Sequence, residues 1–231
     1  MRDYRSFSSI AATRFRPVAQ ALGYTPVTGT VLARIRHSAA PDESPDGWLD
    51  VLALQASRSV SDSFYVNCGV AFPALWPGQT LPALNAATAQ SLALSLHTRL
   101  HTSQGGQGFD RSSKAAVHAS AQEVLTQYAL QIQPWLDSLN TWQALADEYL
   151  RINSRVIGED RMGRHDASYG ADFRAATYGA LLLKAGQSTH AQRWLTEAQT
   201  LLQAQAGCDL LPPGLLAQVQ AALASLKAPS K

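Results

Sequence analysis

Residues 51–70, VLALQASRSVSDSFYVNCGV, decide the predicted fold class. Two apolar runs flank a short polar break, and in the second run Phe64, Val66 and Cys68 alternate with other side chains at the period of a β-strand. Because the break is too short for a crossover helix, the two strands should pair antiparallel. Each run also carries one amide, Gln55 or Asn67, and these polar side chains in apolar strands need an explanation.

Two further strands extend this pair. Residues 28–37 alternate, with Leu32, Arg34 and Arg36 on a face that we expect to meet solvent. A loop rich in Pro and Asp leads to the strand at 48–56, and the third strand covers 64–72. Residues 91–102 favour a fourth strand, although their Ala and Leu content leaves a helix possible.

Helical spacing dominates the rest of the chain. Residues 7–22 form one apolar helix face that ends at Gly23, and everything after Arg111 is expected to be helical, with an interruption at Pro134. The predicted helices after Arg111 are 115–132, 135–152, 172–185, one opening near Thr189 and one starting at Pro213. The sequence therefore predicts an α+β fold, in which an antiparallel meander of about four or more strands packs on helices. An α+β sheet domain (1–110) would be followed by an all-α subdomain (111–231) packed on it.

Composition excludes several classes of protein. The net charge of +2 and the pI near 8.6 are too mild to indicate a nucleic-acid or membrane-surface partner. The N-terminus lacks the apolar segment of a signal peptide, and no run of 18 apolar residues could span a membrane. The two cysteines, 140 residues apart, give no secreted disulfide framework. We expect a cytoplasmic protein.

No catalytic or metal-binding pattern emerges. His97 and His101 have the spacing of a helical zinc pair but lack a third ligand, and His165-Asp166 lies in a polar loop. No phosphate-binding Gly-rich motif with Lys-Ser or Lys-Thr occurs, nor a G-x-S-x-G nucleophile motif. Cys68 is expected to be a buried small hydrophobe. We therefore expect no catalytic residues, no metal and no cofactor.

Charge is unevenly distributed, which suits a protein partner. Residues 1–40 hold six Arg and one Asp, whereas residues 41–62 hold five acidic residues and one Arg. Solvated loops would give the same counts, so both interpretations stay open. The candidate partner-binding residues combine cations from strands with acids from the 38–47 loop: Arg34, Arg36, His97, Arg99, Asp42, Glu43 and Asp46. The four strand residues could line one surface for an anionic or acidic partner, or be an ordinary solvated face. Aromatic residues do not interleave with these arginines, so nucleic-acid stacking is not expected.

The amides of the opening stretch are interpreted as a structural pair. A buried amide without a partner costs roughly 1–3 kcal/mol. Strands that meet through a turn near residues 59–61 bring Gln55 and Asn67 close together, within a register slip or two. We therefore expect a mutual amide contact.

The order of these motifs resembles a bacterial family, domain of unknown function 4304. The resemblance covers roughly residues 7–145 and rests on these positions: Gly23, Tyr24, Gln55, Ser57, Phe64, Asn67 and Gly69. Tyr24 replaces a Phe, Ala56 a Lys and Cys68 an aliphatic residue. The resemblance implies a small cytoplasmic α+β protein without established catalytic residues, and Gln55, Asn67 and Gly69 become its structural fingerprint. Some members look like immunity proteins, which neutralise bacterial toxins by binding them.

Near the C-terminus, the helix pair across Gly186 looks like one tetratricopeptide-type hairpin, through Gly186, Ala191, Trp194, Leu195 and Ala198. No 34-residue repeat accompanies it, so a helical extension of the core is expected rather than a peptide-binding array.

The leading functional hypothesis is therefore non-catalytic protein binding, most specifically by an immunity protein that occludes a toxin. One alternative is an enzyme or anion binder with a site between sheet and helical lobe, using Arg34, Arg36, His97 and Arg99. Another is a helical adaptor.

Overall fold

The computed structural model describes residues 16–17, 19–39, 47–57, 62–88, 94–106, 108–157, 171–204 and 213–227. The chain divides into two compact units. The first comprises Met1–Arg36, Gly47–Pro73 and Leu81–Ser138, and the second comprises His37–Asp46, Ala74–Thr80 and Leu139–Lys231. The sequence-based boundary after residue 110 stays a prediction.

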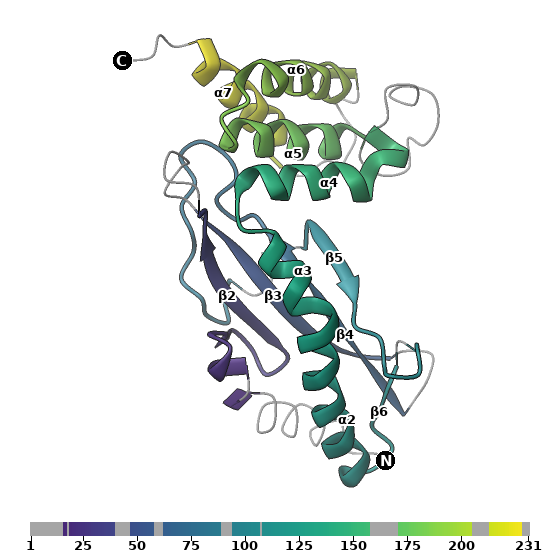
Figure 1. Cartoon of the computed structure of the whole chain (residues 1–231). Coiled ribbons are helices and arrows are strands. Elements are labelled where there is room, and N and C mark those ends of the chain that lie inside the picture. The colour runs from purple at the N-terminus through teal and green to yellow at the C-terminus, as the bar shows by residue number, and fades with distance from the viewer. Residues whose placement is uncertain are drawn as a thin grey trace. The chain divides into compact units, whose positions relative to one another are not determined.

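The first unit is built on a six-stranded sheet in the order β1-β2-β3-β4-β5, with β6 also paired to β4 (Figure 1). Its strands are β1 (Thr25–Pro26), β2 (Val31–His37), β3 (Gly47–Ala56), β4 (Ser63–Ala71), β5 (Leu96–Arg99) and β6 (Phe109–Asp110). Every pairing whose register is known is antiparallel. The predicted α+β class with an antiparallel sheet is confirmed. The segment at 91–102 contributes strand β5, although a shorter one than expected.

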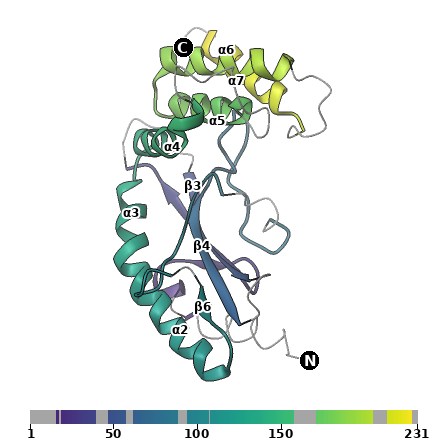
Figure 2. The same ribbon diagram turned by 90° about the vertical axis from the view of Figure 1, so that its right-hand side faces the viewer.

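A helical rod covers one face of the sheet (Figure 2). It consists of α2 (Lys114–Gln127), a π-helical turn (Tyr128–Ile132) and α3 (Gln133–Ser138). The Ser113 side chain caps α2 by accepting a hydrogen bond from the Ala116 N–H at 3.1 Å. Leu32, Leu52 and Val66 from the sheet and Val124, Leu125 and Tyr128 from the rod surround an apolar hollow of about 20 Å³.

The predicted interruption at Pro134 is wrong. The rod runs through this proline, and the helical break falls at residues 139–141 instead. The π turn immediately before Pro134 explains the difference, because the Gln133 N–H bonds to the Tyr128 carbonyl, five residues back. Such a wide turn is one of the local irregularities that let a proline ring fit inside a helix without a clash.

Among the residues that the structure describes, those on the opposite face of the sheet cover it only in part. A small core forms there around Val27, Ala33, Leu49, Val51 and Ala71. Leu81, Leu84 and Leu94 from the connection between β4 and β5 pack against it. Farther along β3, the side chain of Gln55 on this face remains exposed. This face thus combines a covered apolar end with an open polar end.

The N-terminal helix predicted at 7–22 lies mostly outside the described residues. Residues 19–21 are helical, and the chain turns out of the helix at Gly23, whose φ of 81° is in the left-handed region that glycine adopts most readily.

Within the described residues, the second unit is built from helices, as expected. They are α4 (Trp142–Ile157), α5 (Ala171–Lys184), α6 (Ser188–Ala204) and α7 (Leu215–Lys227). The hairpin of α5 and α6 turns at Gly186, where φ is 73°. Its helices approach closely because Gly179 has no Cβ, which would lie 2.9 Å from Leu195 Cγ. The tetratricopeptide-like character of this hairpin stays a prediction.

Candidate functional site

Two groups of polar side chains in the first unit lie on opposite faces of the sheet. Asp50 and Gln55 lie five residues apart on β3, whose pairing with β4 is regular from Leu49 to Ala56. Because strand side chains alternate between faces, an odd separation places these two on opposite sides. One group surrounds Asp50 on the helix-covered face, and the other surrounds Gln55 on the open face.

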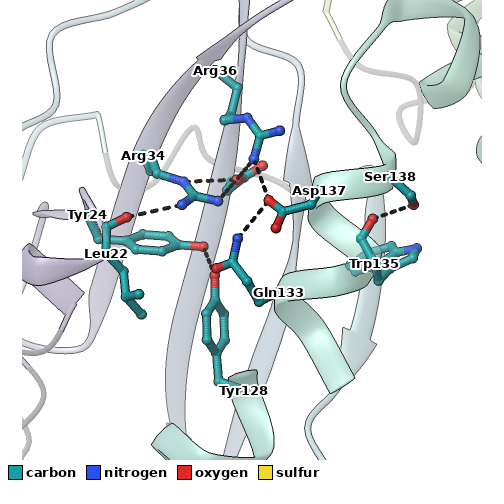
Figure 3. A network of polar contacts seen from close by, with 10 residues as sticks. Leu22, Tyr24, Arg34, Arg36, Tyr128, Gln133, Trp135, Asp137 and Ser138 are labelled. Atoms are coloured by element: carbon teal, nitrogen blue, oxygen red, sulfur yellow. Dashed lines mark hydrogen bonds and ion pairs between the residues drawn. The ribbon is translucent and has the colours of Figure 1, made fainter. Parts of the chain in front are cut away.

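Asp50 is the centre of the first group, which we call the Asp50 network. Its side chain is only 1% exposed, and its Oδ2 atom accepts hydrogen bonds from two arginines of β2, Arg34 and Arg36, which Figure 3 labels. Arg34 donates through Nε at 3.1 Å and Nη2 at 2.6 Å, and Arg36 donates through Nη1 at 3.3 Å. One buried carboxylate therefore balances at most one of the two arginine charges.

The network continues from the arginines to neighbouring elements. Arg36 Nη1 lies 3.5 Å from Asp137 Oδ1 on α3, and this oxygen also accepts a hydrogen bond from Gln133 Nε2 at 2.7 Å. Arg34 donates to the Leu22 carbonyl at 3.1 Å and lies over the Tyr24 ring, 4.9 Å from its centroid. The network thus joins the sheet to the helical rod.

A pair of tyrosine hydroxyls lies beside the network. The oxygens of Tyr24 and Tyr128 are 2.7 Å apart, and Tyr128 belongs to the π turn (Figure 3). Burial raises the pKa of Tyr24 and raises the pKa of Tyr128 to about 12. Both hydroxyls are therefore protonated at neutral pH and are unsuited to act as general bases.

Burial and the neighbouring arginines have opposite effects on the pKa of Asp50. Burial raises its pKa above the ordinary value, whereas the hydrogen bonds and charges of Arg34 and Arg36 act in the opposite direction. The arginines are also only slightly exposed, with side-chain fractions of 16% for Arg34 and 19% for Arg36. The Asp50 network is therefore better suited to stabilise the packing of the rod on the strands than to bind an incoming anion.

The second group crosses three strands on the open face. Asn67 Nδ2 of β4 donates to Gln55 Oε1 of β3 at 3.0 Å, and Arg99 Nε of β5 donates to Asn67 Oδ1 at 3.2 Å. The guanidinium of Arg99 also lies 4.6 Å from the centroid of the Tyr65 ring. We call these four residues the amide relay. The mutual amide contact expected from the sequence is confirmed, and Arg99 is an additional member.

Chemistry fixes the direction of the relay. An arginine nitrogen can only donate, so the Asn67 atom facing Arg99 must be its carbonyl oxygen. The Asn67 amide nitrogen therefore faces Gln55, which must accept through its own oxygen. As a result the Gln55 amide nitrogen is not used within the relay, and the orientation of both amides follows from Arg99.

Gly69 allows β5 to approach closely enough to complete the relay. A Cβ at this position would lie 2.0 Å from the Leu96 carbonyl oxygen and 3.0 Å from His97 Cα. The glycine is thus required by the approach of the β5 backbone, two residues from the position where Asn67 pairs with Arg99.

Comparison with known proteins finds one family model that matches the segment holding the relay. Residues 43–138 match the model of a family described as Domain of unknown function (DUF4304). The segment 43–138 is similar to the DUF4304 family. No curated protein and no solved structure was found to match the chain.

The DUF4304 match confirms the resemblance that the motifs suggested, over a shorter range than expected. Gln55, Asn67 and Gly69 lie inside the matched segment, whereas Gly23 and Tyr24 lie before it. Of the three residues predicted as a structural fingerprint, two are amides of the relay and the third is the glycine that admits the neighbouring strand.

The structure separates the candidate residues that the sequence grouped together. Arg34 and Arg36 belong to the Asp50 network, whereas Arg99 and the exposed His97 lie on the open face. The expectation that the arginine face of β2 meets solvent is wrong, because Asp50 pairs with both arginines beneath the rod. Asp42, Glu43 and Asp46 lie outside the described residues.

The Asp50 network and the amide relay each contain one residue that was not among the candidate site residues predicted from the sequence. Asp50 is an acid inside an otherwise apolar strand, a pattern typical of a buried charge with a partner. Tyr65 alternates with the apolar positions of β4 and therefore shares a face with Asn67.

The described residues also bear on metal-binding clusters, membrane-spanning helices and a reactive cysteine. They contain no group of three or more His, Cys, Asp or Glu side chains that could hold a metal ion. Among them there is also no helix whose length and hydrophobicity would suit a membrane span. Burial raises the pKa of the Cys68 thiol to about 12, which fits the prediction of a small buried hydrophobe.

Proposed function

We propose that this protein is a non-catalytic binding protein that recognises a protein partner through the open face of its sheet. The observation that carries the proposal is the amide relay, whose polar side chains are at least partly exposed and yet are held in one arrangement by hydrogen bonds. Side chains that are ordered before binding lose less conformational entropy when a partner arrives.

The composition of this face supports the same proposal. Tyr and Arg are the residue types that most often dominate the energetics of protein interfaces. Here Arg99 is stacked on Tyr65, and the Tyr65 hydroxyl lies 3.4 Å from the buried Ser57 hydroxyl. The cation and the ring therefore form a supported pair rather than two independent surface side chains.

The most specific form of the proposal is a cytoplasmic immunity protein, whose partner is a cognate bacterial toxin that it neutralises by occlusion. The support for this step is the resemblance to the DUF4304 family, some members of which look like immunity proteins. An anion binder would need Arg34, Arg36, His97 and Arg99 to converge, and Asp50 holds the first two on the other face of the sheet. The geometry therefore favours binding by Arg99 and His97 without them.

The first test is co-expression with the product of the adjacent reading frame in the source genome. We expect that product to inhibit growth alone, and to be harmless and to co-elute with this protein in size-exclusion chromatography when both are present. If this protein forms no complex with the product of the adjacent reading frame and does not restore growth, the immunity assignment is wrong.

A further inference from the structure

We propose that the open face of the sheet recognises a carboxylate of the partner protein through Arg99, with Gln55 as a second donor to an acceptor beside that carboxylate. This inference rests on the proposed function, because it specifies the chemistry of the partner at the same surface. The terminal nitrogens of Arg99 would form the bidentate pair with the carboxylate, and the amide nitrogen of Gln55 would donate to a neighbouring acceptor.

Arg99 is held in a geometry that leaves its outer donors unused. Nε is bonded to Asn67 Oδ1, and the plane of the guanidinium is held over Tyr65. In the described part of the chain, the terminal nitrogens have no hydrogen-bond or ion-pair partner. A guanidinium fixed at Nε and free at its end presents the two-donor fork that matches the oxygens of a carboxylate.

Gln55, at the other end of the relay, also has an unused donor. Its oxygen accepts from Asn67 and its amide nitrogen is unused within the relay, so that nitrogen is the donor that it can offer to a partner. Asn67 uses its oxygen toward Arg99 and its nitrogen toward Gln55. Both amide oxygens of the relay already accept one hydrogen bond within it, whereas the Gln55 amide nitrogen and the terminal nitrogens of Arg99 do not donate within it. The relay therefore presents donors to a partner, and a surface of acceptors would complement it.

A protein carboxylate fits this surface better than a nucleic acid. Nucleic-acid binding depends on several cations that contact successive phosphates, whereas the relay offers one arginine and the whole chain has a net charge of only +2. Arg99 occupies a face of the Tyr65 ring, which leaves less of this aromatic surface for stacking with a base. Both observations favour one carboxylate among neutral acceptors.

The test uses NMR of the full ¹⁵N-labelled chain, titrated separately with a Glu-rich decapeptide, inorganic phosphate and a single-stranded DNA 12-mer. We expect the decapeptide to shift the Arg99 Nε–H and Gln55 side-chain signals more than the other probes do. Arg99→Lys should weaken peptide binding about tenfold, because a lysine cannot reproduce the two-donor fork. Equal or larger shifts with DNA or phosphate would overturn the assignment to a protein carboxylate.

Arg151→Lys is the matched control, since Arg151 is an exposed arginine of α4 in the second unit and should leave the titration unchanged. The co-expression complex separates the two proposals. If the complex forms and Arg99→Lys leaves its affinity unchanged, the carboxylate site is wrong and the proposed function stands. If the decapeptide binds at Arg99 but no protein complex forms, the carboxylate site stands and the proposed function is wrong.

Discussion

Replacement of Asp50 by alanine should lower the free energy of unfolding of the first unit by about 3 kcal/mol, the range found when one partner of a buried ion pair is removed. The substitution leaves Arg34 and Arg36 beneath the rod without the oxygen to which both donate. The limited exposure of the two guanidinium groups lets water compensate in part, so the lower end of that range is expected. Urea denaturation followed by the backbone amide signals of β3 and β4 reports this effect on the first unit alone.

Asp137→Ala provides the comparison within the same network. Asp137 also faces Arg36, but its side chain is 57% exposed. Loss of an exposed ion pair costs at most about 1 kcal/mol, so this variant should remain close to the wild type. Equal stability losses for Asp50→Ala and Asp137→Ala would show that burial of the network does not determine its contribution.

Replacement of Gly69 by valine should disrupt the pairing of β4 with β5. The first carbon of the new side chain would lie 2.0 Å from the Leu96 carbonyl oxygen, and a backbone atom cannot move aside as a flexible side chain can. Overpacking typically costs 1–3 kcal/mol, and a backbone clash of this kind should cost about 3 kcal/mol or more. We expect faster amide exchange along β5 and loss of the contact between Arg99 and Asn67, both observable by NMR.

Gly29→Ala is the control for Gly69→Val, because a Cβ at position 29 meets no heavy atom within 4 Å. This variant should change stability by less than about 0.5 kcal/mol, as a surface substitution usually does. If Gly69→Val were equally harmless, the close approach of β5 would not explain why position 69 is a glycine.

The fold was predictable where local pattern determined it. The alternation along residues 51–70 and the short break between the runs were sufficient to predict the β3–β4 pair and the contact between Gln55 and Asn67. Strands β1 and β6 have two residues each, too few for an alternating pattern to appear. The error at Pro134 has a similar origin, since nothing in the sequence marked the π turn that accommodates the proline.

The site was less predictable because it depends on pairing between distant segments. Arg34 was assigned to a solvated face from the alternation of β2 alone, whereas its partner Asp50 lies 16 residues farther along the chain. Arg99 joins the relay through the register of β5 with β4, across 32 residues. Residue type indicated that these side chains were polar, but only the sheet register determined which of them meet.

Hydrogen–deuterium exchange of the complex with the partner tests the central claim most directly. If the open face of the sheet binds the partner, the peptides that cover residues 62–71 and 94–102 should exchange more slowly in the complex, while residues 114–127 of α2 on the opposite face remain unchanged. Protection confined to α2 and α3, with no change in β4 and β5, would contradict the claim.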